Sequence, residues 1–453
     1  MPVFDAEKLA EWSGGTWTRI PDETVTSIFH DTRKVQPGAM YVAMPGERVD
    51  GHDLIDHAIK AGAVAALCLT GRANPAIPCL QVPDTGKALE QLAKGYRESL
   101  QPKQMIGVTG SAGKTTVKDF LAAMLSESGS TRCTQGNWNN FVGLPLSLLA
   151  MEAHDKFGVF ELGMSEPGEI AGLADILQPD AGLITSIGEA HLERLGSVEA
   201  IAQEKSSLLE ALPSDGMAVL DADSRWFSYA KARCACRIVS VSMLGEADYM
   251  GEMIETGLRV RDCRRNETFE LPVPFPGEHM LMNLLQAVAM VRECGLSAEM
   301  MIRGLEKYAP APMRWQTVQL QKWKVINDAY NANPLSMRKS IRTFAEVPHA
   351  GEKWLVLGGM AELGEAEKEL HWVIGKELDG FGFTGVVLVG EKASWMQQGI
   401  QKTPVILVGS REEAVREMTA CVGDNAVLLL KASRSEQLEL ILQALQKNEE
   451  TKV

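Results

Sequence analysis

Apolar positions follow two different periods along this chain. Near the C-terminus they recur every three or four residues, which in a helix of 3.6 residues per turn places them on one face. A helix is therefore predicted over 435–447, and the polar residues 447–453 are expected to fray. The predicted apolar face consists of Leu438, Ile441, Leu442 and Leu445.

Short apolar runs alternate with helical stretches over the last third of the chain. Strands and helices in succession are typical of a parallel sheet with crossover helices, so an open α/β domain is predicted here. Its strands are expected at 323–329, 354–358, 385–390, 404–408 and 426–431, and its helices at 365–380, 411–421 and 435–447.

The same alternation predicts two further α/β units upstream. In the first, strands are expected at 40–43 and 64–69, around a helix at 53–62 that ends at Gly62, a residue type that often ends helices. A linker is predicted at 101–103. The second unit is expected to contain strands at 104–108, 157–162, 181–187 and 216–221 and helices at 114–128 and 198–212.

Length and composition fit a protein with several cores. A chain of 453 residues suggests about three domains, predicted at 1–101, 102–312 and 313–453. The net charge of −14 disfavours a nucleic-acid partner, since such binding usually needs a basic surface. The chain has neither a signal peptide nor a long apolar run, so a cytoplasmic location without membrane insertion is expected.

The eight cysteines are scattered, and only Cys234 and Cys236 lie close together. One C-x-C pair does not make a zinc framework. Reduced thiols, as is usual in cytosolic proteins, are therefore expected.

A glycine-rich turn between a predicted strand and a predicted helix is the strongest local signal. Its glycines would let backbone amides and the positive helix N-terminus surround phosphate oxygens. Lys114 would reach the β- and γ-phosphates, and the Thr115 hydroxyl would bind Mg²⁺. Val108 replaces the first glycine of the strict P-loop pattern, and a turn with an incidental lysine is the structural alternative. The phosphate-binding residues are expected to be Thr109, Gly110, Ser111, Ala112, Gly113, Lys114, Thr115 and Thr116.

The chain lacks the signature motifs of two other classes of nucleotide-binding protein. The chain has no N-K-x-D motif for reading guanine and no L-S-G-G-Q motif of transport ATPases. A kinase or a ligase remains.

Motifs across the whole chain resemble the Mur ligase family, which includes the folylpolyglutamate synthases. The shortened P-loop is followed by G-N-W-N-N-F-V-G-L-P at 136–145, E-L-G at 161–163 and A-H-L-E at 190–193. Lys205, Asn283 and Arg314 follow in the family's order.

Three further motifs resemble the branch of the family that adds D-alanyl-D-alanine. They are D-A-Y-N-A-N-P-L-S-M at 328–337, G-G-M-A-E-L-G at 358–364 with His371, and K-A-S-R at 431–434. Segments 31–38, 45–48 and 50–52 resemble the family's UDP-sugar-binding domain. The chain departs from the branch at Met313 and Ala432, where glycine is common, and at Gly359, where aspartate is common.

The resemblance implies an N-terminal domain for the UDP-linked substrate, a central P-loop ATPase-type domain and a C-terminal Rossmann-like domain. It also implies a monomer that uses ATP and Mg²⁺ to join D-alanyl-D-alanine to UDP-N-acetylmuramoyl-tripeptide through an acyl phosphate. The third residue of the acceptor peptide, diaminopimelate or lysine, is left open.

The resemblance also implies a set of roles. The catalytic residues would be Lys114, Glu161, His191, Lys205 and Arg314. Metal ligands would be Thr115, Glu161, His191 and Lys205, the last as a carbamate. Asn283, Arg314 and Asp328 would join the glycine-rich loop in binding ATP. Substrate-binding residues would be Thr32, Arg33, Gly46, Asn137, Asn139, Asn140, Tyr330, Asn331, Asn333 and Ser336, the last three in a loop after strand 323–329.

Several alternatives stay open at this point. Taken alone, Lys205 would be a solvated helix lysine, Arg314 an interdomain ion pair, and the residues after Tyr330 ordinary turn formers. A sister ligase that adds a single amino acid is a second enzyme hypothesis, which the loop at 330–334 disfavours. A nucleotide-binding protein without turnover is the third, and the intact set of metal-site residues disfavours it.

Overall fold

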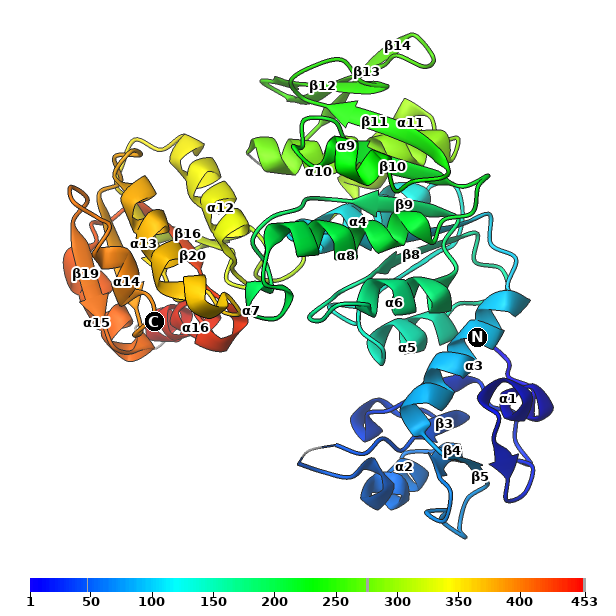
Figure 1. Ribbon diagram of the computed structural model, residues 1–453. Coiled ribbons are helices and arrows are strands. Elements are labelled where there is room, and N and C mark those ends of the chain that lie inside the picture. Colours follow the sequence, from blue (N-terminus) through cyan, green and yellow to red (C-terminus); the bar gives the residue numbers. More distant parts are fainter. Residues whose placement is uncertain (47, 274–276, 451–453) are drawn as a thin grey trace.

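The structure, a computed structural model, describes residues 1–46, 48–273 and 277–450. It contains three sheets, one within each of the predicted ranges, and helices cover the faces of each sheet (Figure 1). The predicted three-part α/β fold is therefore confirmed, while the domain boundaries stay predictions. In the part of the chain described, no helix is long and apolar enough to cross a membrane.

The first sheet has the strand order β1-β5-β4-β3-β2, and only β1 is antiparallel. Strands predicted at 40–43 and 64–69 are confirmed as β3 and β4, and the helix predicted at 53–62 is a 3₁₀ turn (Gly51–Leu54) followed by α2. The elements are α1 Ala6–Ser13, β1 Thr16–Trp17, β2 Ser27–Phe29, β3 Ala39–Val42, α2 Ile55–Lys60, β4 Ala63–Leu69, β5 Cys79–Val82 and α3 Thr85–Ser99.

Helix α3 joins the first unit to the second. The Asp84 side chain caps its N-terminus, and its apolar face contains Leu89, Leu92 and Tyr96. The Tyr96 hydroxyl donates to Met151 O at 2.7 Å. Residues of both units belong to one apolar cluster, so their cores are continuous.

The central sheet places the glycine-rich loop in its middle. Its order is β14-β13-β12-β11-β10-β9-β6-β8-β7, and β6, which leads into the loop, lies between β8 and β9. The predicted strands and helices of this unit are confirmed, although the strand predicted at 181–187 ends at Ile184 and the helix predicted at 114–128 ends at Leu125. Its elements before β12 are β6 Gln104–Thr109, α4 Lys114–Leu125, β7 Thr131–Cys133, α5 Gly143–Leu149, β8 Phe157–Glu161, α6 Glu169–Leu177, β9 Ala181–Ile184, α7 Leu192–Leu195, α8 Val198–Glu210, β10 Met217–Asp221, α9 Phe227–Lys231 and β11 Arg237–Ser242.

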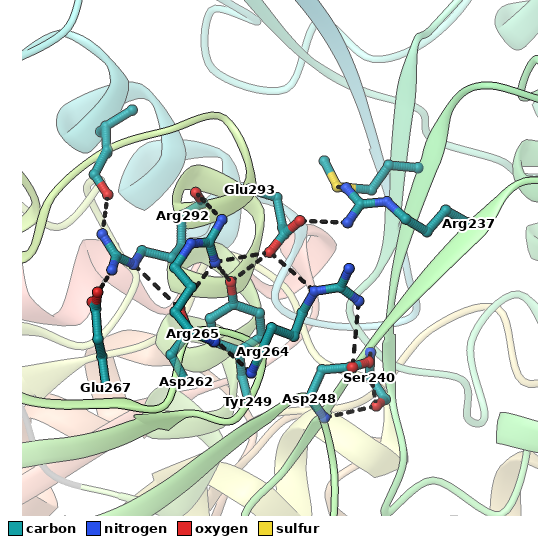
Figure 2. Close-up of polar contacts among 12 residues, drawn as sticks. Arg237, Ser240, Asp248, Tyr249, Asp262, Arg264, Arg265, Glu267, Arg292 and Glu293 are labelled. Carbon is teal, nitrogen blue, oxygen red and sulfur yellow. Dashed lines mark hydrogen bonds and ion pairs between the residues drawn. The ribbon is translucent and has the colours of Figure 1, made fainter.

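Three strands that the sequence did not predict extend this sheet as an antiparallel meander. They are β12 Tyr249–Ile254, β13 Gly257–Asp262 and β14 Glu267–Pro272, followed by α10 Glu278–Glu293 and α11 Ala298–Glu306. Figure 2 shows how arginines join the meander to α10. Glu293, whose side chain is 5% exposed, accepts from the Tyr249 hydroxyl and from Arg265 at 3.1 Å, and buried Asp262 pairs with Arg265 and Arg292.

The third sheet has the order β15-β16-β20-β17-β18-β19, with only β15 antiparallel. All five strands predicted here are confirmed, as are the first two helices, whereas α12 was not predicted. The elements are β15 Gln316–Gln319, β16 Trp323–Asn327, α12 Pro334–Glu346, β17 Lys353–Leu357, α13 Glu367–Leu378, β18 Gly385–Val389, α14 Ser394–Gln397, β19 Val405–Val408, α15 Arg411–Cys421, β20 Ala426–Lys431 and α16 Glu439–Glu450.

The last helix differs from its prediction at both ends. Gln437 has a left-handed backbone (φ 51°), which breaks the helix there and makes α16 begin at Glu439. The helix continues to Glu450, so the fraying predicted from 447 is wrong up to that residue, while 451–453 lie outside the described residues.

Candidate active site

A cavity of about 460 Å³ lies where the central and C-terminal units meet. This volume lies within the range that encloses small-molecule ligands. Most of the predicted site residues line it. They are Ser111, Ala112, Gly113, Lys114, Thr115, Thr116, Asn137, Asn139, Asn140, Glu161, His191, Asn283, Arg314, Asp328, Tyr330, Asn331, Asn333 and Ser336.

The glycine-rich loop has the backbone that an anion site needs. Gly113 precedes α4 with φ 88° and no side chain caps the helix, which leaves its first amides free for a ligand. A Cβ on Gly113 would lie 2.7 Å from Asn283 Oδ1, and one on Gly110 would lie 1.9 Å from Thr185 Oγ1. Only glycine therefore allows the loop to pack this closely.

Lys114 Nζ is held inside the loop, where it donates to Gly110 O at 2.6 Å. Burial lowers the pKa of this ammonium group, Glu161 opposes the shift, and the nearby Arg314 charge adds to it. A lysine side chain held in a polar cavity, with a backbone carbonyl as its hydrogen-bond partner, is suited to a phosphate ligand.

Glu161 ends β8 beside the loop, at the carboxyl edge of a parallel sheet where ligand sites occur. The residue is 1% exposed. Its Oε2 accepts from Asn139 at 3.4 Å, while its Oε1 is buried and has no hydrogen-bond partner among the described residues. A buried carboxylate oxygen without a donor fits a bound cation, and the hydroxyl of Thr115, which lines the same cavity, would be a second oxygen ligand.

His191 comes from the loop before α7, with φ 57°. Its Nδ1 is in ion-pair contact with the Glu362 carboxylate, although the approach is not that of a well-directed hydrogen bond. This contact lowers the pKa of Glu362 against the effect of burial. Glu193 N also donates to Glu362 O at 3.1 Å, so the C-terminal unit fixes this loop. The described residues hold no cluster of three or more histidine, cysteine or acidic side chains suited to a metal.

Lys205 lies on α8 and is 1% exposed, which rules out the solvated helix lysine. It does not line the cavity. Burial lowers its pKa well below the usual value, the Lys114 charge adds to this shift, and Glu204 opposes it. Glu204 accepts from Gly168 N and Ile170 N, both at 2.8 Å, and so holds the start of α6.

The C-terminal unit supplies the opposite wall. The Arg314 guanidinium stacks over the Tyr330 ring at 4.1 Å. Asp328 is engaged by protein groups, accepting from Lys431 Nζ at 2.7 Å and from the Ser340 hydroxyl. Met313, where the family commonly has glycine, has φ 60°, the left-handed conformation that glycine adopts most readily.

Asn333 and Ser336 have a helix-capping role as well as a place in the cavity. Asn333 is the N-cap of α12, and the two residues form a capping box. The predicted loop position of Ser336 is therefore wrong, since it lies in the first turn of α12. Asn333 Nδ2 also donates to Ser111 O at 3.0 Å, which links the two units across the cavity.

The other predicted site residues do not line this cavity. Thr109 is buried and donates to Leu162 O, and Gly110 packs against Thr185. Arg33 is paired with Asp31, and its side chain is 87% exposed. The roles predicted for Thr32, Arg33 and Gly46 stay predictions, and Glu47 of the same motif lies outside the described residues.

Several lining residues were missed or left without a role. Lys339 follows Ser336 by one helical turn, so the capping box of α12 could have located it. Lys431 is the last residue of β20. It lies at the same carboxyl end of the parallel strands as Asp328, which follows β16. Ser165 and Glu169 line the cavity from the loop that Glu204 holds, and no sequence pattern connects the two segments.

All three units of the chain match known protein families. Residues 24–97 match the model "Mur ligase family, catalytic domain", 108–291 the Mur ligase middle domain, and 313–434 "Mur ligase, glutamate ligase domain". The chain is 33% identical over 451 residues to the Bacillus subtilis UDP-N-acetylmuramoyl-tripeptide–D-alanyl-D-alanine ligase, covering 97% of each chain.

Solved structures give the same result. A crystal structure of MurF from Acinetobacter baumannii superposes with a TM-score of 0.89 at 29% identity, covering 99% of both chains. MurF ligase from Thermotoga maritima in complex with ADP gives 0.82 at 28% identity, covering 95% of this chain and 99% of that one. This chain therefore belongs to the Mur ligase family.

Proposed function

We propose that the protein uses ATP to join D-alanyl-D-alanine to UDP-N-acetylmuramoyl-tripeptide in peptidoglycan precursor synthesis. The observation that carries this proposal is the shared cavity, where an uncapped phosphate loop faces Arg314 and Tyr330 of the other unit. The relatives matched along nearly the full chain are named for this reaction, and one was solved with ADP.

The chemistry needs an activated carboxylate, because a free carboxylate is a poor electrophile. ATP transfers its γ-phosphoryl group to the acceptor carboxylate, the amine of D-alanyl-D-alanine attacks the acyl phosphate, and phosphate leaves. Lys114 and the amides before α4 hold the phosphates, and Arg314 balances charge on the transferred group from the opposite wall. The stacked Tyr330 ring fixes the direction of that arginine.

Glu161, Thr115 and His191 are the residues of this cavity suited to hold Mg²⁺. The buried Glu161 oxygen without a donor is the observation that supports this assignment. Bound Mg²⁺ would neutralise phosphoryl charge. The Glu362 contact takes Nδ1 of His191 and leaves Nε2 as its ligand atom.

Lys205 is suited to become a carbamate. Its lowered pKa favours the neutral amine, which attacks CO₂ to form an N–C bond and releases one proton. The resulting anion would place negative charge near Lys114, whose positive charge disfavours an ammonium group at the same position. A ¹³C carbamate resonance from protein prepared in ¹³C-bicarbonate, absent from Lys205→Arg, would verify this.

The UDP part is assigned to the N-terminal unit through Thr32, Arg33 and Gly46, and the dipeptide to the segment from Tyr330 to Ser336. A monomer contains the whole proposed site. A sister ligase for a single amino acid is less well supported, because the relatives matched along nearly the full chain are named for the dipeptide.

The test is phosphate release from the purified protein with Mg-ATP, UDP-muramoyl tripeptide and D-alanyl-D-alanine, each omitted in turn. Release is expected only with all three, with a product heavier by the dipeptide less water. Turnover with a single amino acid would overturn the branch assignment, and a binding protein would show none. Tripeptides ending in diaminopimelate or lysine would identify the acceptor.

Lys114→Met is the variant for this assay. It should lower turnover on the order of 10²- to 10³-fold, the usual effect of removing one group that stabilises transition-state charge. Lys322→Met, which changes an exposed lysine paired with Asp424, should leave turnover unchanged.

A further inference from the structure

Two thiols lie in contact between α9 and β11, in a region that the proposed reaction does not use. Cys234 Sγ and Cys236 Sγ are 3.3 Å apart. Neither residue lines the cavity. All eight cysteines are free thiols in this structure.

The backbone holds the two thiols together from both sides. Cys234 N donates to Lys231 O at 3.2 Å, which fastens it to the end of α9. Arg237, directly after Cys236, pairs with Met217 in the β10–β11 ladder. The contact is therefore built into the fold, and a modest approach of the sulfurs reaches the 2.05 Å or so of a disulfide.

The two thiols differ in exposure. Cys234 is partly exposed, whereas Cys236 is 8% exposed and packs with Leu209, Leu212 and Ala230. Burial, followed by the hydrogen bond with Cys234, raises the pKa of Cys236 to about 12. Cys234 is therefore the thiol that meets a reagent from solvent, and Cys236 is the partner held behind it.

We propose that Cys234 and Cys236 form a reversible modification site, a dithiol that peroxides oxidise to an intramolecular disulfide. The Cys234 thiolate attacks the peroxide, breaks its O–O bond and becomes a sulfenic acid. The Cys236 sulfur then attacks the Cys234 sulfur, the S–S bond forms and water leaves. With hydrogen peroxide, two thiols and one peroxide give one disulfide and two waters, and a dithiol reductant reverses the change.

The chain provides its own controls. Cys263 and Cys421 are exposed but have no neighbouring thiol among the described contacts, so they report peroxide reactivity without a resolving partner. Cys68 and Cys79 lie on adjacent strands and are 0% exposed, so they report a thiol pair that solvent does not reach.

The experiment treats the full-length protein with graded hydrogen peroxide, alkylates remaining thiols and digests with trypsin. Cleavage after Arg233 and Arg237 releases the peptide 234–237. We expect this peptide to lose two hydrogen atoms and to stop at the disulfide, whereas Cys263 and Cys421 go on to sulfinic and sulfonic acids, because only Cys234 has a resolving thiol that traps its sulfenic acid. Dithiothreitol should restore it, and the Cys68–Cys79 pair should stay reduced.

Two variants test the separate roles of the two thiols. Cys236→Ser should leave a Cys234 sulfenic acid that a dimedone probe labels, and Cys234→Ser should leave Cys236 unreacted. Both variants should keep the wild-type turnover. Over-oxidation of Cys234 without the dehydrogenated peptide would overturn the proposal, as would a dehydrogenated peptide that dithiothreitol does not restore.

Discussion

Glu204 acts on the cavity without lining it. Its two carboxylate oxygens accept from Gly168 N and Ile170 N, and it is 7% exposed. The segment it holds carries Ser165 and Glu169, which do line the cavity.

Glu204→Gln should loosen that segment. The amide can accept from one of the two N–H groups but presents a donor to the other, which costs roughly 1–3 kcal/mol for the unsatisfied group. Hydrogen exchange at Gly168 and Ile170 should quicken and the melting temperature should fall. The matched change Glu199→Gln, at an exposed position of the same helix, should do neither.

Glu362 is a positioning residue for His191. Glu362→Gln should lower Mg²⁺ affinity by about 10- to 100-fold, the usual effect of losing the partner that orients a metal-binding histidine. The ¹⁵N shifts of the His191 ring should also change in the metal-free protein. If the ring shifts and Mg²⁺ titration match those of Glu365→Gln, an exposed neighbour, the orienting role is wrong.

At this scale the sequence pattern itself predicted the glycine-rich loop and the strand-end Glu161, whereas the roles predicted for His191 and Lys205 came from the family resemblance. It could not predict Glu204 or Glu362, since each acts on a residue from a different segment. The left-handed backbone of Met313 could not be predicted either, because methionine rarely adopts that conformation.

Among the elements, the β12–β14 meander depends on charge for its attachment to α10. Burial alone would raise the pKa of Glu293, but hydrogen bonds from Tyr249, Arg237 and Arg265 outweigh it and lower the pKa from 4.5 to about 2 (Figure 2). A carboxyl group whose pKa is depressed in the folded state stabilises that state above its unfolded pKa.

The stabilisation from Glu293 should therefore be complete above about pH 4.5 and should be lost as the pH falls toward 2. Glu293→Gln should be less stable at pH 7 by about 3 kcal/mol and should show a flatter loss of stability between pH 5 and pH 2, both measured by urea unfolding. Glu267→Gln, which removes an exposed partner of Arg292, should keep the wild-type pH dependence and lose at most about 1 kcal/mol.

Elements with a clear hydrophobic period were the ones predicted. Strands β18 and β20 of the C-terminal sheet are buried on both faces and stand out as apolar runs. The meander strands mix exposed charges with apolar residues, as in β14, so they lack such runs. Helix α12 was not predicted because its motif was interpreted as a loop. Asn333, Pro334 and Ser336 are also residue types that begin a helix.

In the molecule as a whole, the two junctions between units are different. The first is a continuous apolar core around α3. The second carries polar links, among them Asn333 to Ser111 and Arg338 to Glu189 at 3.4 Å. Polar contacts of this kind can break and form again as the two units open and close around a ligand.

Asn333→Ser separates the capping role from the interdomain role. Serine still caps α12 but lacks the amide that reaches Ser111 O. Stability should change by less than about 0.5 kcal/mol, while kcat/KM for ATP should fall roughly five- to tenfold, the value of one hydrogen bond.

Asn333→Ala is the comparison. It should show the same kinetic loss and, in addition, lose about 1 kcal/mol of stability from the missing cap. Equal kinetics for Asn333→Ser and the wild type would mean that the link to Ser111 does not contribute to closure.

The continuous core around α3 also bears on how the chain folds as it is synthesised. The apolar face of α3 is completed by α5 and α6, which emerge from the ribosome only after residue 177 has been added. The N-terminal sheet cannot finish burying its helix until then, so the first two thirds of the protein should mature as a single co-translational unit. The C-terminal sheet, which has separate apolar clusters of its own, can follow independently.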